Sequence, residues 1–238
     1  MNSWFQFKQF TIQQDMCAMK VCTDACLFGA WVSNKFEQTL SPNSVLDIGC
    51  GTGLLSLMLA QKTDTPIDAV EIDEMAYKQA KKNVELSPWQ EQISVHHTAI
   101  INFIPTYKYD LIICNPPFYE NQLKSVDVAR NLAMHATSLS FASLSSILKQ
   151  QLCHLGVAAL LLPSSVVKNM EEHLNKESLF IIEKTDISHS PSHSFFRSFL
   201  LVSHKKYMCR GESIAIKNSN NQYSDEFVKL LKDYYLHL

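Results

Sequence analysis

The sequence lacks the features that mark secreted, membrane-spanning or metal-binding proteins. Its seven cysteines include no C-x-x-C pair, which disfavours a zinc site or a disulfide framework and favours reduced thiols. The nine histidines show no H-E-x-x-H spacing. No apolar run approaches the length of a membrane span, and no basic segment followed by an apolar one opens the chain. We therefore expect a cytoplasmic protein that binds neither metal nor membrane.

Charge is also scarce, with 18% charged residues and a formal net charge of −2. Because Lys and Arg supply most of the affinity for phosphates, this balance disfavours a uniformly basic nucleic-acid-binding protein. A local basic patch is still compatible with it. Taken singly, each basic residue near the chain ends could equally be an ordinary surface residue. The candidates for a patch are Lys8, Lys20, Lys35, Lys205, Lys206 and Arg210.

The 238 residues and 46% hydrophobic content suit one α/β domain with a substantial core. We expect a hairpin and a helix in residues 1–40 and a catalytic core in residues 41–238, with Asp24 as the N-cap of that helix. Strands and helices then alternate, which predicts a mostly parallel sheet with helices on both faces. The predicted strands are 5–10, 16–21, 44–48, 67–71, 93–96, 109–114, 157–162, 178–187 and 195–205, and the predicted helices are 24–35, 53–62, 73–86, 139–153 and 165–175.

A glycine-rich turn joins the first predicted strand of the core to a helix. Gly49, Gly51 and Gly53 allow unusual backbone dihedrals and the close approach of a ligand to the main chain. The spacing Gly-x-Gly-x-Gly differs from the Gly-x-Gly-x-x-Gly of the dinucleotide fingerprint, and no Gly-Lys-Ser/Thr follows as in a P-loop. A glycine turn alone is weak support for a ligand site, because structural turns also use glycine.

An acidic residue follows the next predicted strand. Glu71 lies about 20 residues past the glycine turn, at the carboxyl end of that strand. In a parallel α/β sheet this position lets a carboxylate accept hydrogen bonds from both hydroxyls of a ribose. A solvated strand-end carboxylate is the alternative, but beside the glycine turn we favour a ribose-binding role.

The stretch Asn115-Pro116-Pro117-Phe118 follows the apolar strand 109–114. Because proline cannot donate to a ladder, two prolines end the strand and fix the exit of the chain. The Asn115 side chain and the Pro116 carbonyl remain as acceptors, and Phe118 offers a ring face. Such a group of residues can grip a planar amino group, although an Asn-Pro pair alone more often marks a simple turn.

These motifs together carry a family resemblance. Residues 47–53 (DIGCGTG), Glu71 and residues 115–118 (NPPF) resemble the ordered signatures of class I S-adenosylmethionine-dependent methyltransferases. The NPPF form is similar to that of enzymes that methylate exocyclic amino groups or glutamine side chains. Residues 5–31 and the tail 221–236 resemble the two ends of bacterial tRNA1(Val) (adenine(37)-N6)-methyltransferases.

The resemblance implies a Rossmann-like fold with a seven-stranded sheet and an antiparallel edge hairpin. It also implies S-adenosylmethionine as cofactor, the anticodon loop of a tRNA as partner, and a monomer without an obligate protein partner. The implied roles are catalytic for Asn115, Pro116 and Phe118; cofactor-binding for Asp47, Gly49, Gly51, Gly53, Glu71, Ile72, Ala99 and Asn115; and substrate-binding for Pro117, Tyr119, Lys8, Lys20, Lys205, Lys206 and Arg210.

Ala99 is a departure from the family pattern. Related enzymes often carry an acidic residue there, whose side chain contacts the adenine of the cofactor. Ala99 keeps only its backbone N–H for that contact, so either the cofactor is bound less tightly or Asn102 or water substitutes.

Three other functions stay open. The same acceptor pair would serve the N2 of a guanine in ribosomal RNA or the side chain of a protein glutamine. Glutamine methyltransferases usually carry an extra N-terminal helical domain, and the stretch before the glycine turn is too short for one. A nucleic-acid-binding protein with an inactive methyltransferase fold is the third, and Ala99 is its only support.

Overall fold

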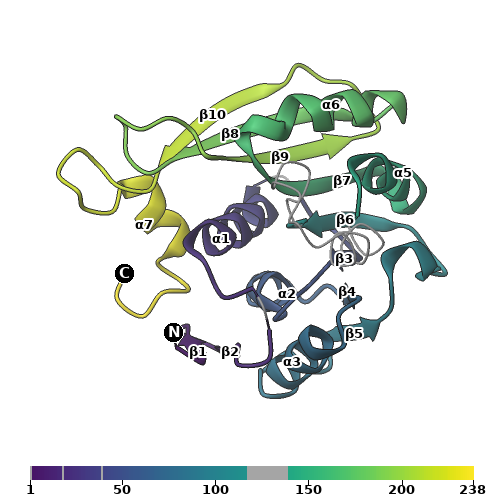
Figure 1. Ribbon diagram of the computed structural model, residues 1–238, viewed down its shortest axis with the longest axis horizontal. Coiled ribbons are helices and arrows are strands. Elements are labelled where there is room, and N and C mark those ends of the chain that lie inside the picture. The colour runs from purple at the N-terminus through teal and green to yellow at the C-terminus, as the bar shows by residue number, and fades with distance from the viewer. Residues whose placement is uncertain (1, 18, 39, 117–138) are drawn as a thin grey trace, which may run out of the picture.

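The computed structural model describes residues 2–17, 19–38, 40–116 and 139–238 (Figure 1). The strands of its main sheet are β3 (Val45–Ile48), β4 (Ile67–Glu71), β5 (Ile93–His97), β6 (Tyr109–Cys114), β7 (Leu152–Pro163), β8 (Phe180–Ser188), β9 (Arg197–Ser203) and β10 (Arg210–Ala215). The helices are α1 (Thr23–Gln38), α2 (Leu54–Ala60), α3 (Glu74–Glu85), α5 (Phe141–Gln151), α6 (Val167–Lys176) and α7 (Asp225–Leu231), with 3₁₀ turns η1 (Ile100–Asn102) and η2 (Ser164–Val166).

Within the described residues, the main sheet has eight strands in the order β10-β8-β9-β7-β6-β3-β4-β5. Strand β9 runs antiparallel to its neighbours β7 and β8, and the other neighbouring strands are parallel. The predicted α/β class, with its antiparallel hairpin, is confirmed. The expected number of seven strands is wrong, because β10 adds an eighth beside β8. Most of its residues are exposed, so it has little of the apolar pattern that identifies a buried strand.

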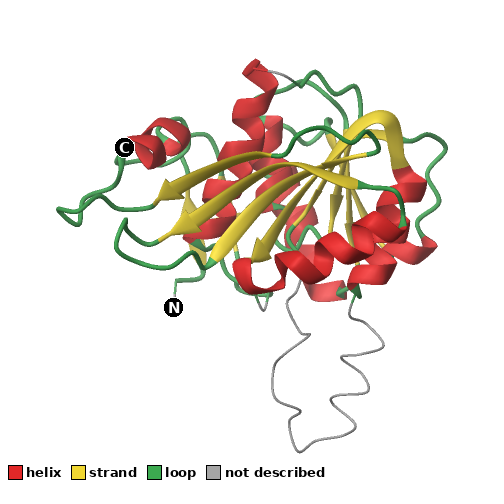
Figure 2. Ribbon diagram, turned by 90° about the horizontal axis from the view of Figure 1, so that it is seen from above, coloured by secondary structure: helices red, strands yellow, loops and turns green. Residues whose placement is uncertain are grey.

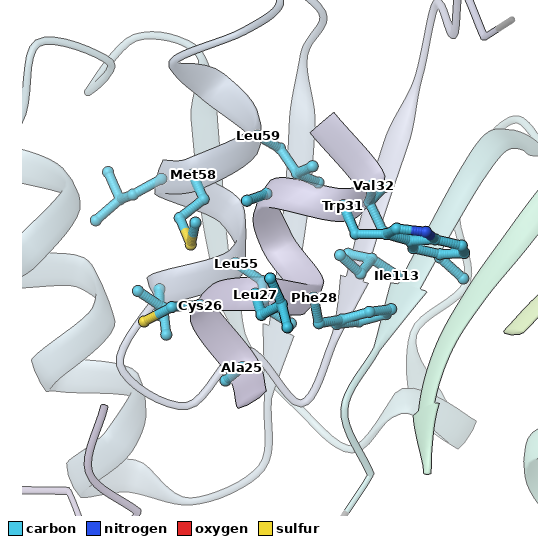
Figure 3. Close-up of a cluster of buried hydrophobic side chains, with 14 of the residues drawn as sticks. Ala25, Cys26, Leu27, Phe28, Trp31, Val32, Leu55, Met58, Leu59 and Ile113 are labelled. Atoms are coloured by element: carbon cyan, nitrogen blue, oxygen red, sulfur yellow. The ribbon is translucent and has the colours of Figure 1, made fainter. Parts of the chain in front are cut away.

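Helices cover both faces of the sheet (Figures 1 and 2). Side chains alternate along each strand, so Leu111 and Ile113 of β6 point to one face and Ile112 and Cys114 to the other. The first face packs against α1, α2, α3 and α7, and the second against α5 and α6. Figure 3 shows the first of these cores, where Phe28 and Trp31 of α1 lie near Ile113. Burial on both faces explains why the central strands are continuous apolar runs.

The N-terminal hairpin differs from its predicted bounds. Its strands are β1 (Trp4–Gln6) and β2 (Thr11–Gln13), so the strand predicted over residues 16–21 is wrong. Backbone N–H groups there donate to side-chain amides instead of to a ladder, as Met16 does to Gln79 Oε1 at 2.9 Å. Helix α1 begins at Thr23, so Asp24 lies in its first turn and is not the N-cap. Instead, Asp24 Oδ2 accepts a hydrogen bond from Arg197 Nε at 2.8 Å.

None of the helices in the described ranges is long and apolar enough to cross a bilayer. The cytoplasmic location, the monomeric state and the division at residue 40 stay predictions.

A close approach between β6 and β7 gives a test of the fold. A Cβ added at Gly156 would lie 2.9 Å from the backbone oxygens of both Tyr109 and Asp110, which cannot move aside cheaply. We expect Gly156→Ala to lower the free energy of unfolding by about 1–3 kcal/mol in urea titrations. Gly211→Ala is the matched control, because a Cβ there meets nothing within 4 Å. Equal stability of the two variants would contradict this description of the β6–β7 contact.

Candidate active site

The turn between β3 and α2 has a backbone that only glycine adopts readily. Gly49, Gly51 and Gly53 have φ values of 70°, 57° and 80°. A Cβ added at Gly49 or Gly51 would meet nothing within 4 Å, whereas one at Gly53 would touch Ala80 of α3 at 3.6 Å. The first two glycines therefore border open space, and the third packs against a helix. The glycine-rich turn, residues 49–53, thus leaves main chain accessible to a ligand.

Asp47 of β3 forms hydrogen bonds with α2 and so holds the two elements on either side of the glycine-rich turn together. Its side chain is fully buried, and its Oδ2 accepts hydrogen bonds from Ser56 Oγ at 2.6 Å and Ser56 N at 3.2 Å. Within the described residues, Oδ1 has no hydrogen-bond partner. Burial raises the pKa of Asp47 to about 7, despite the opposing hydrogen bonds from Ser56. A buried acceptor of this kind is completed by a ligand that brings a donor or a positive charge.

Glu71 connects the end of β4 to the glycine-rich turn. Its Oε2 accepts from Gly51 N at 2.9 Å, and its Oε1 accepts from Asp73 N at 2.9 Å. An ionised carboxylate has about four acceptor positions, so each oxygen of Glu71 can accept one further hydrogen bond. The carboxylate is therefore placed to bind two hydroxyls while it holds the turn. This anchoring contact to Gly51 is an addition to the predicted role.

Ile72 and Ala99 lie at the same edge of the sheet as Glu71. Ile72 follows Glu71 directly, and its large apolar side chain is 47% exposed. Ala99 precedes η1 and is placed beside β4 by the hydrogen bond from Thr98 N to the Glu71 carbonyl at 3.0 Å. An exposed isoleucine beside a strand-end carboxylate offers an apolar face to a flat ring next to a ribose.

Asn115 lies beside the glycine-rich turn. The register pairs Ile48 of β3 with Cys114 of β6, so Gly49 and Asn115 both follow directly after this pair at the same sheet edge. Within the described residues, the buried Asn115 Oδ1 has no hydrogen-bond partner. Pro116 is buried and has no N–H to donate. Pro117, Phe118 and Tyr119, for which catalytic or substrate-binding roles were predicted, lie outside the described residues.

Two amides on α3 are site-supporting residues that the sequence interpretation missed. Asn83 Oδ1 accepts from Gln13 N, and its Nδ2 donates to the carbonyls of Gln13 and Thr52, each at 2.9 Å. Gln79, one turn earlier, accepts from Met16 N. Both side chains are buried, so they join the N-terminal segment to the glycine-rich turn through α3. In the sequence, two amide side chains four residues apart on an otherwise apolar helix face would have indicated buried hydrogen bonds to another segment.

The N-terminal segment brings Cys17 within range of the charge of Glu71. Cys17 is buried, and its burial together with the charges of Glu71 and Asp73 raises its pKa. Val21 N donates to Gln14 Oε1 at 2.8 Å, which folds this segment back on itself. The segment therefore lies close to one side of the ribose-binding position predicted at Glu71.

The basic residues predicted near the N-terminus make internal contacts. Lys8 Nζ donates to the carbonyls of Lys232 at 2.5 Å and Leu238 at 3.0 Å. Lys20 Nζ donates to the carbonyl of Gln14. Lys35 forms an ion pair with Glu183 at 2.5 Å and lies over the Trp31 ring. These contacts tie the chain together and supply no evident group for phosphate binding.

The basic residues predicted near the C-terminus lie near the amino ends of the parallel strands. Lys205 and Lys206 follow the end of β9, where Ser203 pairs with Val157 near the start of β7. Arg210 begins β10. Because β9 is antiparallel to β7, this end is opposite to the carboxyl ends of the parallel strands that carry Asn115. These three residues therefore do not lie beside Asn115, and their role in substrate binding stays a prediction.

The donors and acceptors of this edge fit S-adenosylmethionine. S-adenosylmethionine has polar groups along its length. They match the oxygen of Asp47 that lacks a partner among the described residues, the open space at Gly49 and Gly51, and the remaining acceptor positions of Glu71. Ile72 adds an apolar surface. The unpaired acceptor of Asn115 is one residue past the β3–β6 register, where it can meet an amino group beside that ligand.

Comparisons with known proteins identify related sequences. Residues 31–142 match the family model of the methyltransferase small domain. The chain is 38% identical to a tRNA1(Val) (adenine(37)-N6)-methyltransferase of Flavobacterium psychrophilum, over 98% of this chain and 99% of the relative. It is 40% identical to the protein of the same name from Trichodesmium erythraeum, over 98% and 97% of the two chains.

Solved structures support the fold. A predicted O-methyltransferase from Agrobacterium tumefaciens superposes with a TM-score of 0.66 at 14% identity, covering 88% of this chain and 96% of the other. An S-adenosylmethionine-dependent methyltransferase from Clostridium acetobutylicum has a TM-score of 0.53 at 16% identity, over 77% and 92% of the two chains. At these identities the likeness concerns the fold alone.

Two glycine variants test whether S-adenosylmethionine occupies the open space beside Gly51. Gly51→Ala and Gly53→Ala both force a β-carbon into a positive φ, a strain of about 1–2 kcal/mol. Only the methyl group at position 51 enters the open space beside the turn. We expect Gly51→Ala to weaken binding of S-adenosylmethionine by about tenfold or more in calorimetry, and Gly53→Ala to change it much less. Equal losses of affinity would place the ligand elsewhere.

Proposed function

Because the chain belongs to the family of tRNA1(Val) (adenine(37)-N6)-methyltransferases, we propose that Asn115 and Pro116 hold the N6 amino group of adenine 37 in the anticodon loop of that tRNA during its methylation. The enzyme is a tRNA (adenine-N6)-methyltransferase that uses S-adenosylmethionine. The buried, unpaired Oδ1 of Asn115 beside Gly49 is the observation that carries the proposed residue roles.

Asp47, the glycine-rich turn and Glu71 bind the cofactor in this proposal. Asp47 faces the amino-acid end, Glu71 accepts from the two ribose hydroxyls, and Ile72 and the Ala99 backbone contact the adenine. When bound, S-adenosylmethionine supplies a methyl group activated by its sulfonium. The contact between Glu71 and Gly51 keeps the turn and the ribose acceptor in one fixed relation.

Asn115 and Pro116 act on the amino group of the target base. The N6 of adenine is a poor nucleophile because its lone pair is delocalised into the ring. The new N–C bond would form as the S–CH3 bond of the sulfonium breaks, with that bond's electron pair left on sulfur as a neutral thioether. Positive charge then develops on nitrogen and makes its N–H groups stronger donors. The Asn115 Oδ1 and the Pro116 carbonyl each accept one of these N–H groups, so they stabilise the charge where it develops. The nitrogen then loses one proton to solvent.

Positioning supplies the second part of the rate acceleration. An acceptor pair on a strand end allows the base only the orientation in which its amino group faces the methyl donor. The target base must leave its stack or lie in an open loop to reach such a position. An anticodon loop meets that requirement, and Phe118 is proposed to stack on the base there.

Two substitutions at Asn115 separate the acceptor role from mere packing. Asn115→Ala removes the acceptor and should lower kcat for tRNA methylation by about 10²–10³, the cost of removing one preorganised electrostatic contact. Asn115→Asp keeps an oxygen at the same place and should retain more activity than the alanine variant. Both should bind S-adenosylmethionine with nearly unchanged affinity, as measured by calorimetry. Full turnover by Asn115→Ala would remove Asn115 from the mechanism.

A further inference from the structure

A polar groove lies at the carboxyl ends of the parallel strands β8 and β10, apart from the active site. It has a volume of about 480 Å³ between the loop that follows β8 and the residues that follow β10. His189 and His193 line one wall, and Lys217, Asn218 and Asn221 line the other. Ile216 N donates to the Ser188 carbonyl at 2.9 Å and Lys217 N to the His189 carbonyl at 3.0 Å. These bonds hold the two walls together. We call this surface the 189–221 groove.

The sheet register places the 189–221 groove on the same edge as Asn115. Ile187 of β8 and Pro163 of β7 both pair with Arg197, so β7 and β8 end at the same level. Strand β6, which carries Asn115, is parallel to β7. Three strand spacings separate β6 from β8 and four separate it from β10, so the groove lies at least about 14–19 Å to the side of Asn115.

The chemistry of the groove suits an anionic chain. No Asp or Glu is among the residues that line it, and Lys217 supplies a cation. Lys217 Nζ donates to Asn221 Oδ1 at 2.8 Å, which holds the ammonium at the wall. Serine hydroxyls and asparagine amides alongside it can donate to phosphate and sugar oxygens.

Aromatic and cationic side chains adjoin the groove. Phe195 is 50% exposed at the end of the loop that forms its first wall. The rings of His189 and Phe196 stack with centroids 4.1 Å apart and 5° between their planes. The Arg197 guanidinium, which is paired with Asp24, lies 5.5 Å from the Phe196 ring. Exposed aromatic rings beside cations are the surfaces on which unpaired bases stack.

A second concave surface lacks these properties. It has a volume of about 300 Å³ and is lined by Lys62, Lys229 and Lys232, but also by Asp233, which pairs with Lys62 at 2.6 Å. Lys62 lies between the end of α2 and the start of β4, so this surface is at the opposite edge of the sheet. Its carboxylate and its position both disfavour a role beside the target base.

We propose that the 189–221 groove binds the ribose-phosphate backbone of the tRNA next to the flipped target base, with Lys217 on a phosphate and Phe195 under a neighbouring base. The proposal rests on the proposed function for the identity of the RNA. It assigns substrate binding to a part of the chain outside the sequence motifs.

Lys217→Ala and Phe195→Ala test the groove. Lys217 is half-buried and Phe195 is 50% exposed, so neither substitution removes a core side chain and both should leave folding intact. Binding of fluorescent, unmodified tRNA1(Val) transcript is measured by anisotropy at several salt concentrations. Each variant should bind about 5–30-fold more weakly than the wild type, and Lys217→Ala should reduce the salt slope by about 1. The double variant Lys205→Ala/Lys206→Ala is the matched control at the opposite edge and should retain wild-type affinity.

Turnover separates this proposal from the proposed function. At saturating tRNA the two groove variants should keep the wild-type kcat, with the loss confined to KM. If the wild type methylates the tRNA while both groove variants bind it as tightly as the wild type, the groove is overturned and the function stands. If binding depends on Lys217 and Phe195 but the wild type transfers no methyl group, the groove stands and the function fails. A loss of affinity only in the Lys205/Lys206 control would move the RNA to the other edge.

Discussion

The carboxylate of Glu71 is the contact on which the candidate active site depends. One oxygen accepts from Gly51 N and the other from Asp73 N, so a single side chain fixes the glycine-rich turn and the chain entering α3 to the end of β4. Only 8% of Glu71 is exposed, so these charge-assisted hydrogen bonds are largely shielded from water. Backbone bonds from Gly49 N and Cys50 N to the Val70 carbonyl hold the same turn to β4, and Glu71 adds the side-chain contact at Gly51.

The parallel sheet places the glycine-rich turn and Glu71 next to Asn115. Strands β4, β3 and β6 are neighbours, and all three end at one edge. The carboxylate, the glycine-rich turn and the Asn115 acceptor therefore lie in a row, although they are far apart in sequence. Asn83 forms hydrogen bonds with both Gln13 and Thr52, so it links the N-terminal segment to the glycine-rich turn. Ligands of open α/β sheets bind at the carboxyl ends of the strands for the same reason.

The sequence identified the parts of the site whose chemistry is local. Gly49 and Gly51 have the positive φ that favours glycine, and Glu71 ends a strand at a fixed spacing from them, so these motifs could be recognised without a structure. The missed features depend on contacts between distant segments. Strand β10 is mostly exposed and forms only because β8 offers an edge. The N-terminal segment is held by hydrogen bonds to Gln79 and Asn83. Because β9 is antiparallel to β7, Lys205 lies at the opposite end of the strands from Asn115.

The central claim is that Asn115 and Pro116 together present an acceptor pair to the N6 of a tRNA adenine beside a bound methyl donor. The most direct measurement incubates the protein with unmodified tRNA1(Val) transcript and S-adenosylmethionine labelled in its methyl group, followed by digestion to nucleosides. We expect the label to elute as N6-methyladenosine and to disappear when adenine 37 is replaced by guanine. Label in a methylated guanosine, or the absence of any transfer to RNA, would contradict the claim.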